Sequence, residues 1–292
     1  MTNTDWINRT EYPFASHHFQ TPAGRLHYVD EGDGQPVVML HGNPTWSFLY
    51  RNLIKQLSPH YRCIAPDHLG FGLSDKPADW SYLPSDHADN LAALIEHLGL
   101  KNITLVVQDW GGPIGLHYAV THPGNVARLV VMNSWAWPVN HDPHYLMFSM
   151  FMGGPIGRML IRKRNFFAGT FMRAAFGDKS KLSQETHEHY LRALPDAEAR
   201  RGCYIFPKQI VDSTEWLRRI WSSVPVLRDK PALFVWGMED VAFREKELKQ
   251  WLNAFPQARI VRLLRVGHFV QEEAPEELAQ AVEDFLSRET ST

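Results

Sequence analysis

Short, mostly apolar runs alternate with amphipathic stretches along most of the chain. The runs have five to seven residues and predict buried strands at 36–40, 61–66, 103–108, 127–133, 231–237 and 258–264. Helical patterns follow at 46–57, 85–98, 112–123, 244–254 and 275–287, and residues 16–20 and 25–30 flank the turn "TPAG" as a predicted hairpin. Apolar runs that do not alternate with polar residues are typical of a parallel sheet covered by helices on both faces.

This alternation is interrupted between residues 134 and 224, where the pattern predicts helices and loops. We therefore expect a core domain formed by 1–133 and 225–292 and a helical cap domain formed by 134–224. An insertion at the carboxyl edge of a parallel sheet is well placed to cover a binding site. Aromatic residues are crowded between 135 and 176, and we expect some of them to line a cavity under this cap.

Composition excludes several classes of function. The 292 residues include 30 Lys and Arg and 32 Asp and Glu, so a nucleic-acid partner is not indicated. No apolar run reaches the roughly 18 residues of a membrane span, and the polar N-terminus has no signal-peptide pattern. We therefore expect a cytoplasmic protein without a membrane partner, and the oligomeric state stays open. Cys63 and Cys203 have neither metal nor redox spacing.

The stretch "LVVQDWGGPIG" at 105–115 has the outline of a nucleophile elbow, in which a strand, a sharp turn and a helix expose one side chain. The exposed position usually holds serine, but here it holds Asp109. Gly111 and Gly112 allow the close approach of strand and helix that such a turn needs. Asp109 is therefore the candidate nucleophile.

Two further candidates follow later strands. Asp240 comes after the run at 231–237, and His268 comes after the run at 258–264. The order of nucleophile, acid and base is that of the α/β-hydrolase catalytic triad. In such a triad the acid orients the base, and the base serves the chemistry at the nucleophile.

The chain resembles the haloalkane dehalogenases over essentially its whole length. The resemblance is carried by "HGNPTWSFLYR" (41–51), "PDHLGFGLSDKP" (66–77), "QDWGGPIG" (108–115) and "GHFVQEEAPEE" (267–277). It implies an α/β-hydrolase fold with a mostly parallel eight-stranded sheet and an inserted helical cap. It also implies hydrolytic dehalogenation of a small apolar haloalkane by water, without cofactor or metal, through an alkyl ester on Asp109.

The resemblance also implies roles for other residues. Asn43 and Trp110 would donate hydrogen bonds to the halide, and their backbone N–H groups would form the oxyanion hole. Some family members have a glutamate acid at the position of Asn133, so Asp240 as the acid resembles the third subfamily, with its Asp-His-Asp triad and Asn and Trp donors. Asn133 either forms hydrogen bonds near His268 or simply ends a strand.

Alternative functions remain open. An epoxide hydrolase uses the same aspartate nucleophile but needs cap tyrosines, for which Tyr145, Tyr190 and Tyr204 are candidates. A serine esterase is disfavoured because G-x-S-x-G is absent, and a metal enzyme because neither H-E-x-x-H nor a Cys/His cluster is present. A ligand-binding receptor on a hydrolase scaffold would not need the three triad residues.

Overall fold

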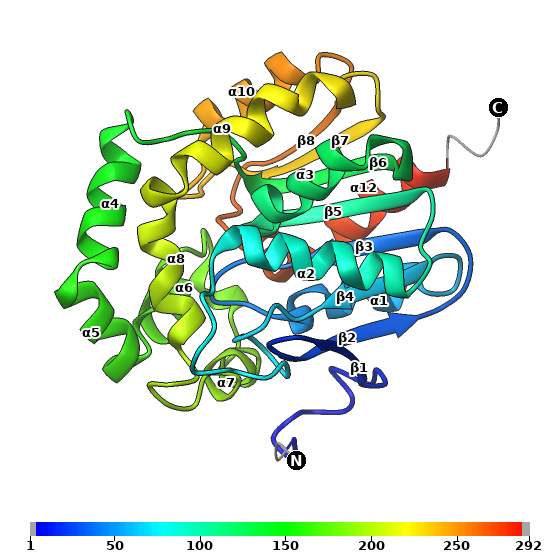
Figure 1. The fold of residues 1–292 in the computed structure, drawn as a ribbon. Helices are drawn as coiled ribbons and strands as arrows, with labels where there is room; N and C mark the ends of the chain where they lie inside the picture. Colours follow the sequence, from blue (N-terminus) through cyan, green and yellow to red (C-terminus); the bar gives the residue numbers. More distant parts are fainter. Residues whose placement is uncertain (1–3, 288–292) are drawn as a thin grey trace.

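An eight-stranded, mostly parallel sheet forms the centre of the molecule, as Figure 1 shows for the computed structural model, which describes residues 4–287. The strand order is β1-β2-β4-β3-β5-β6-β7-β8, and only the pairs β1–β2 and β2–β4 are antiparallel. The predicted strands are confirmed, and their bounds are β1 His17–Thr21, β2 Gly24–Glu31, β3 Pro36–Leu40, β4 Arg62–Pro66, β5 Ile103–Asp109, β6 Val126–Ser134, β7 Ala232–Gly237 and β8 Arg259–Leu263.

Helices cover both faces of this sheet, which is the α/β-hydrolase arrangement that the sequence predicts. In Figure 1, α2 and α3 lie on one face, and α1 and α12 lie on the other. Pro84 begins α2, and Gly99, with φ +61°, follows its end in the left-handed conformation that glycine favours. The bounds of the helices outside the β6–β7 connection are α1 Arg51–Leu57, α2 Pro84–His97, α3 Gly111–Thr121, α10 Glu245–Ala254, α11 Val270–Glu273 and α12 Pro275–Ser287.

The connection between β6 and β7 is helical. Its helices α4 to α8 lie together beside the sheet, at the left of Figure 1, and α8 packs along α4. The α-helices of this connection, including α9, have the bounds α4 Pro143–Gly153, α5 Pro155–Arg164, α6 Met172–Ala174, α7 Gln184–Arg192, α8 Arg201–Asp212 and α9 Thr214–Ser223.

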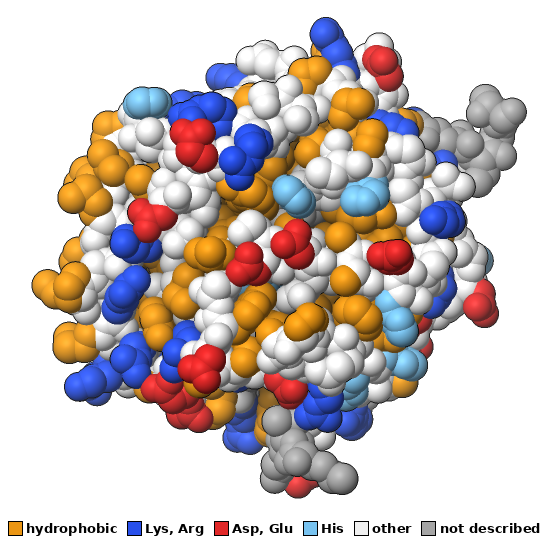
Figure 2. Space-filling model, in the orientation of Figure 1, with side chains coloured by type: hydrophobic (Ala, Val, Ile, Leu, Met, Phe, Trp, Pro, Cys, Tyr) orange, Lys and Arg blue, Asp and Glu red, His pale blue; other side chains and the backbone are white. Residues whose placement is uncertain are grey.

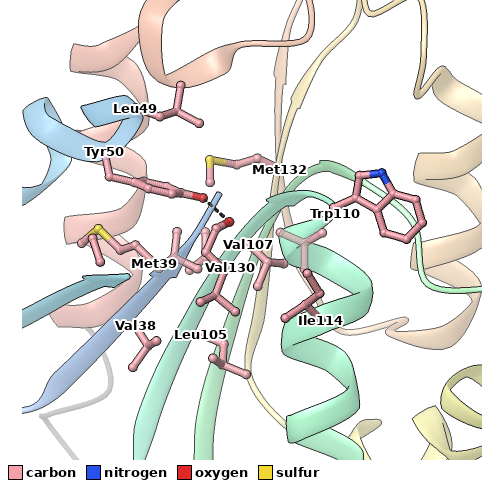
Figure 3. Close-up of a cluster of buried hydrophobic side chains, with 14 of the residues drawn as sticks. Val38, Met39, Leu49, Tyr50, Leu105, Val107, Trp110, Ile114, Val130 and Met132 are labelled. Atoms are coloured by element: carbon pink, nitrogen blue, oxygen red, sulfur yellow. Dashed lines mark hydrogen bonds between the residues drawn. The ribbon is translucent and has the colours of Figure 1, made fainter. Parts of the chain in front are cut away.

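Aliphatic side chains of the central strands form the core between the sheet and its helices. Figure 3 shows Val107 of β5 and Ile114 of α3 in this cluster, while the ring of Trp110 points away from it. The buried Tyr50 donates a hydrogen bond of 2.9 Å to the carbonyl oxygen of Leu40 at the end of β3. The packed core therefore fixes the position of the carboxyl ends of the strands, and the candidate residues lie at these ends.

The sequence also raised the state of the two cysteines and the length of the apolar segments. Cys63 and Cys203 are both buried free thiols. Within residues 4–287, every helix falls short of the length or the apolar character that crossing a bilayer requires.

Candidate active site

Asp109 occupies a strained turn between β5 and α3. Its φ of 49° lies in the left-handed region, which is uncommon for a residue other than glycine and typical of a nucleophile elbow. A Cβ atom at Gly42 would collide with the Asp109 side chain, and one at Gly111 would collide with the carbonyl oxygen of Leu40. The glycines therefore allow the strand, the turn and the helix to approach closely enough to present this carboxylate.

Backbone donors hold the Asp109 carboxylate at the start of α3. The Asn43 N–H donates to Oδ1 over 2.7 Å, and the Trp110 N–H also donates to the carboxylate. Burial raises the pKa of Asp109 above its ordinary value, although these N–H groups and His268 oppose the rise. The site thus combines a desolvated carboxylate with donors that favour its charged form.

His268 lies between two carboxylates. Its Nδ1 is 2.8 Å from Oδ2 of Asp240, and its Nε2 is 3.9 Å from Oδ2 of Asp109. Burial by itself lowers the pKa of His268, but the charge and hydrogen bond of Asp240, together with Asp109, raise it above the ordinary value. The structure thus brings together three residues that the sequence pattern indicates in three separate loops.

Asn133 supports the acid. Its Nδ2 donates to Oδ2 of Asp240 over 2.8 Å and to the carbonyl oxygen of Gly237 over 3.0 Å, while its Oδ1 accepts from the Gly237 N–H over 2.8 Å. The interpretation of Asn133 as a residue that simply ends a strand is therefore wrong. Its amide ties β6 to β7 and helps to orient the carboxylate that faces His268.

Gln108 holds the histidine and Glu273 holds the loop before it, and the sequence pattern indicates neither role. The Gln108 amide nitrogen lies 2.8 Å from Nε2 of His268 and 3.3 Å from its carbonyl oxygen, which fits a ring protonated on Nδ1. The Glu273 carboxylate accepts from the N–H groups of Gly267, Gly177 and Asp178 over 2.9, 2.9 and 3.0 Å. It joins the loop of His268 to the chain that follows α6.

The side chains of Asn43 and Trp110 lie beside the carboxylate. Asn43 Nδ2 is 3.3 Å from the carbonyl oxygen of Cys203, and the Trp110 indole N–H has no partner among residues 4–287. The indole is fixed by Phe206, stacked at 4.9 Å between ring centroids, and by Trp135, edge-on at 4.7 Å. Both side chains line the cavity above Asp109 and can direct N–H groups into it.

That cavity has a volume of about 220 Å³ and is mostly apolar. Of the three candidate tyrosines, only Tyr145 lines it, and its hydroxyl donates to the carbonyl oxygen of Ala242 over 3.0 Å. The hydroxyl of Tyr190 instead donates to Glu272. The other lining residues are Asn43, Asp109, Trp110, Trp135, His144, Phe148, Phe167, Phe171, Pro207, Ile210, Val241, Ala242, Phe243 and His268.

This arrangement can carry out nucleophilic chemistry followed by hydrolysis. The carboxylate can serve as a nucleophile and the histidine as a base, and the cavity has room for a small apolar molecule against them. Across residues 4–287, no cluster of three His, Cys, Asp or Glu side chains is arranged to hold a metal ion.

Comparison with known proteins relates the chain to characterised families. Residues 35–275 match the model of the α/β-hydrolase fold. "Haloalkane dehalogenase 2" of Mycobacterium tuberculosis H37Rv is 43% identical over 273 residues, which cover 93% of this chain and 94% of the relative. A mutant haloalkane dehalogenase from Agrobacterium tumefaciens C58, of known structure, superposes with a TM-score of 0.87 at 26% identity, covering 97% and 100% of the two chains.

A relative with a different printed activity also matches over most of the chain. The "Cis-3-alkyl-4-alkyloxetan-2-one decarboxylase" of Shewanella oneidensis is 35% identical over 293 residues, which cover 97% of this chain and 91% of the relative. The dehalogenase relative is the more similar of the two. By its fold and by its identity over nearly the whole chain, this protein belongs to the haloalkane dehalogenase family of α/β hydrolases.

Proposed function

We propose that the protein hydrolyses small haloalkanes to an alcohol, a halide ion and a proton, through an ester on Asp109. The observation that carries the proposal is the placement of Asp109. Its Oδ1 accepts from the Asn43 N–H, its Oδ2 faces His268, and the cavity above it is lined by Asn43 and Trp110. Membership of the dehalogenase family supports the same reaction.

The two carboxylate oxygens have different parts in the first half-reaction. Oδ1 accepts the Asn43 N–H, so Oδ2, which faces His268 at 3.9 Å, attacks the saturated carbon and forms the new C–O bond as the carbon–halogen bond breaks. The departing halide carries the electron pair of that bond and needs no proton. The indole N–H of Trp110 and the amide of Asn43 stabilise the developing negative charge, since both groups are donors.

The second half-reaction releases the product. His268 removes a proton from a water molecule, whose oxygen adds to Cγ of the ester. The bond between Cγ and Oδ2 then breaks, the alkoxide takes the proton of the new hydroxyl group to leave as the alcohol, and the proton on His268 passes to solvent. Oδ1 is the ester carbonyl oxygen, so the backbone N–H groups of Asn43 and Trp110 stabilise the oxyanion that forms on it. Asp240 holds the Nδ1-protonated tautomer of His268 and stabilises its cation.

We further propose that residues 134–224 act as a cap domain over the core. Tyr145, Phe148, Phe167 and Phe171 come from this segment and line the cavity, which supports that role. A desolvated cavity suits both an apolar substrate and attack by a carboxylate. The Asp240 acid with Asn43 and Trp110 as donors also supports assignment to the subfamily with an Asp-His-Asp triad.

A second candidate function is β-lactone decarboxylation. It is favoured by the 35% identity to the Shewanella oneidensis relative over 97% of this chain. Epoxide hydrolysis has less support, because Tyr145 alone of the three candidate tyrosines lines the cavity and its hydroxyl is already bonded to Ala242.

The experiment offers the purified protein, without added metal or cofactor, a terminal bromoalkane, a cis-3,4-dialkyl β-lactone and a terminal epoxide. Bromide and acid released in equal amounts support the proposal, and an Asp109→Asn variant controls for background hydrolysis. Alkene release from the lactone with no bromide from any bromoalkane would replace dehalogenation by the second candidate.

A further inference from the structure

Two neighbouring helices carry an unusual concentration of exposed apolar side chains. Five of the nine exposed large hydrophobic residues among those described lie on α4 and α5, and they are between 49% and 70% exposed. Figure 2 shows apolar side chains along the left edge of the molecule, where Figure 1 places these two helices. The five residues, here called the α4–α5 face, are Met147, Met150, Phe151, Ile156 and Met159.

The spacing of these residues forms one stripe on each helix. Met147, Met150 and Phe151 are three and four residues apart on α4, while the opposite side of α4, with Ser149 and Gly153, packs against Lys208 of α8. The outward stripe therefore faces away from the protein and has no intramolecular role in the core. Apolar stripes of this kind mark contact sites.

The charged side chains that α5 carries are all positive, α4 carries no acidic residue, and the nearby carboxylates of Glu198 and Asp212 are paired with Arg162 and Lys208. The sequence between Asp142 and Asp178 contains no acidic residue, although the chain as a whole has a formal net charge of −2. Lys163 lies four residues after Met159 and seven after Ile156, on the same side of α5, and Arg164 adjoins it. Both cations are exposed and have no ion-pair partner in the described part of the chain.

We propose that the α4–α5 face docks on the surface of a bilayer that contains anionic lipids. Flexible apolar side chains would enter the boundary between headgroups and acyl chains, and Lys163 and Arg164 would contact phosphate groups, as in interfacial amphipathic helices. A second copy of the chain fits less well, because a symmetric contact of this face with itself would offer Lys163 and Arg164 no acidic side chain as a partner. Surface docking needs no spanning helix, and it replaces the expectation of no membrane partner.

The docked orientation places the cavity close to the lipid. Among the residues that line the cavity, His144 and Val241 are exposed, and His144 lies three residues before Met147 on α4. An apolar substrate dissolved in the bilayer would therefore reach the cavity beside the helix that contacts the lipid. This last step rests on the proposed function, whereas docking itself does not.

The test is flotation of the full-length protein with vesicles of phosphatidylcholine, alone or mixed with phosphatidylglycerol, so binding is measured without turnover. Wild type should float with the anionic vesicles and lose binding at high salt. The pair Lys163→Gln and Arg164→Gln should weaken partitioning roughly 25-fold, at about fivefold per cation. The pair Met150→Ser and Phe151→Ser should weaken it at least about tenfold per residue, since each loses its apolar burial.

Matched controls alter comparable residues elsewhere on the surface. Val226→Ser with Leu264→Ser removes two other exposed apolar side chains, and Lys179→Gln with Lys181→Gln removes two other cations. Both controls should float like wild type. The proposal is overturned if wild type fails to float, if either control loses as much binding as its partner pair, or if light scattering shows self-association that Phe151→Ser abolishes without any lipid binding.

Discussion

Replacing Asp240 with asparagine tests the division of the reaction into two steps. Both carboxylate oxygens of Asp240 accept hydrogen bonds: Oδ1 from the Ala242 N–H over 2.6 Å, and Oδ2 from His268 and Asn133 over 2.8 Å each. An asparagine amide has only one accepting oxygen. Its NH₂ group must therefore point either at the Ala242 N–H or at His268 and Asn133, which are also donors. If the amide nitrogen faces His268, the ring must take the other tautomer, and its Nε2 can no longer accept a proton from water.

The magnitude follows from the charge that is lost. During hydrolysis His268 becomes a cation next to Asp240, and two unit charges about 4 Å apart attract by roughly 4 kcal/mol at an effective dielectric constant of about 20. Loss of that attraction slows hydrolysis by about a thousandfold. The mismatched tautomer adds to this, and the corresponding loss in a serine protease is about 10⁴-fold. We expect a fall of roughly 10³- to 10⁴-fold in steady-state turnover.

The assay is rapid mixing with a bromoalkane. Attack by Asp109 does not need the base, so the Asp240→Asn variant should release one equivalent of bromide per active site in a burst and then turn over slowly. Intact-protein mass spectrometry should detect one alkyl group on Asp109. The pKa of His268 should fall, because Asp240 raises it, so the acidic limb of the residual hydrolysis should move to lower pH.

The control is Glu239→Gln, which removes the adjacent carboxylate and should leave the burst and turnover unchanged. Adding Asn133→Asp to Asp240→Asn should restore part of the turnover, because that side chain already lies 2.8 Å from Asp240. Rescue should be incomplete, since an aspartate loses the bond to the carbonyl oxygen of Gly237. Near-normal turnover in Asp240→Asn alone, or loss of the bromide burst, would refute the role assigned to Asp240.

Four further predictions concern the same site. The His268→Gln variant should accumulate the ester on Asp109, as detected by peptide mass spectrometry, and an adduct elsewhere would contradict this assignment. Trp110→Phe and Asn43→Ala should each raise the barrier to single-turnover alkylation by roughly 3 kcal/mol, by analogy with a lost oxyanion donor, and unchanged alkylation would exclude them as halide donors. In wild type, hydrolysis requires neutral His268 and alkylation requires ionised Asp109. The ordinary pKa of histidine, 6.5, lies well above that of aspartate, 3.8, and Asp240 raises the pKa of His268, so hydrolysis should fail first as the pH falls and the ester should accumulate, which acid-quench mass spectrometry across pH can check. Glu273→Gln removes a charged acceptor from three backbone N–H groups, so calorimetry should show a lower melting temperature, and an unchanged value would mean that these bonds contribute little.

Local patterns predicted the sheet because its central parallel strands are buried on both faces and therefore appear as continuous apolar runs. The elbow could also be predicted, since the turn at Asp109 needs small residues at the start of the following helix, and Gly111 and Gly112 come two and three residues after it. Asp240 and His268 could be selected because the carboxyl ends of parallel strands meet at one edge of the sheet. Each of these inferences uses residues that are close together in the chain.

Long-range contacts could not be predicted in this way. Asn133 meets Asp240 across 107 residues, and Gln108 meets His268 across 160. The role of each depends on where its side chain points at the end of a strand, and residue type alone does not specify that. The resemblance to family members with glutamate at Asn133 drew attention to this position, but only the hydrogen bonds distinguish a residue that supports Asp240 from one that ends a strand.

The unequal surroundings of the two Asp109 oxygens explain how one carboxylate can serve both half-reactions. If both oxygens were held by backbone donors, the nucleophile would be too well stabilised to attack; if neither were held, the ester would lack an oxyanion hole. Here Oδ1 accepts from the Asn43 N–H, while Oδ2 faces His268 at 3.9 Å, beyond hydrogen-bond distance. Attack through Oδ2 also removes the negative charge that helps to raise the pKa of His268. Ester formation thus favours the neutral imidazole that the next step requires, so the product of the first half-reaction prepares the base for the second.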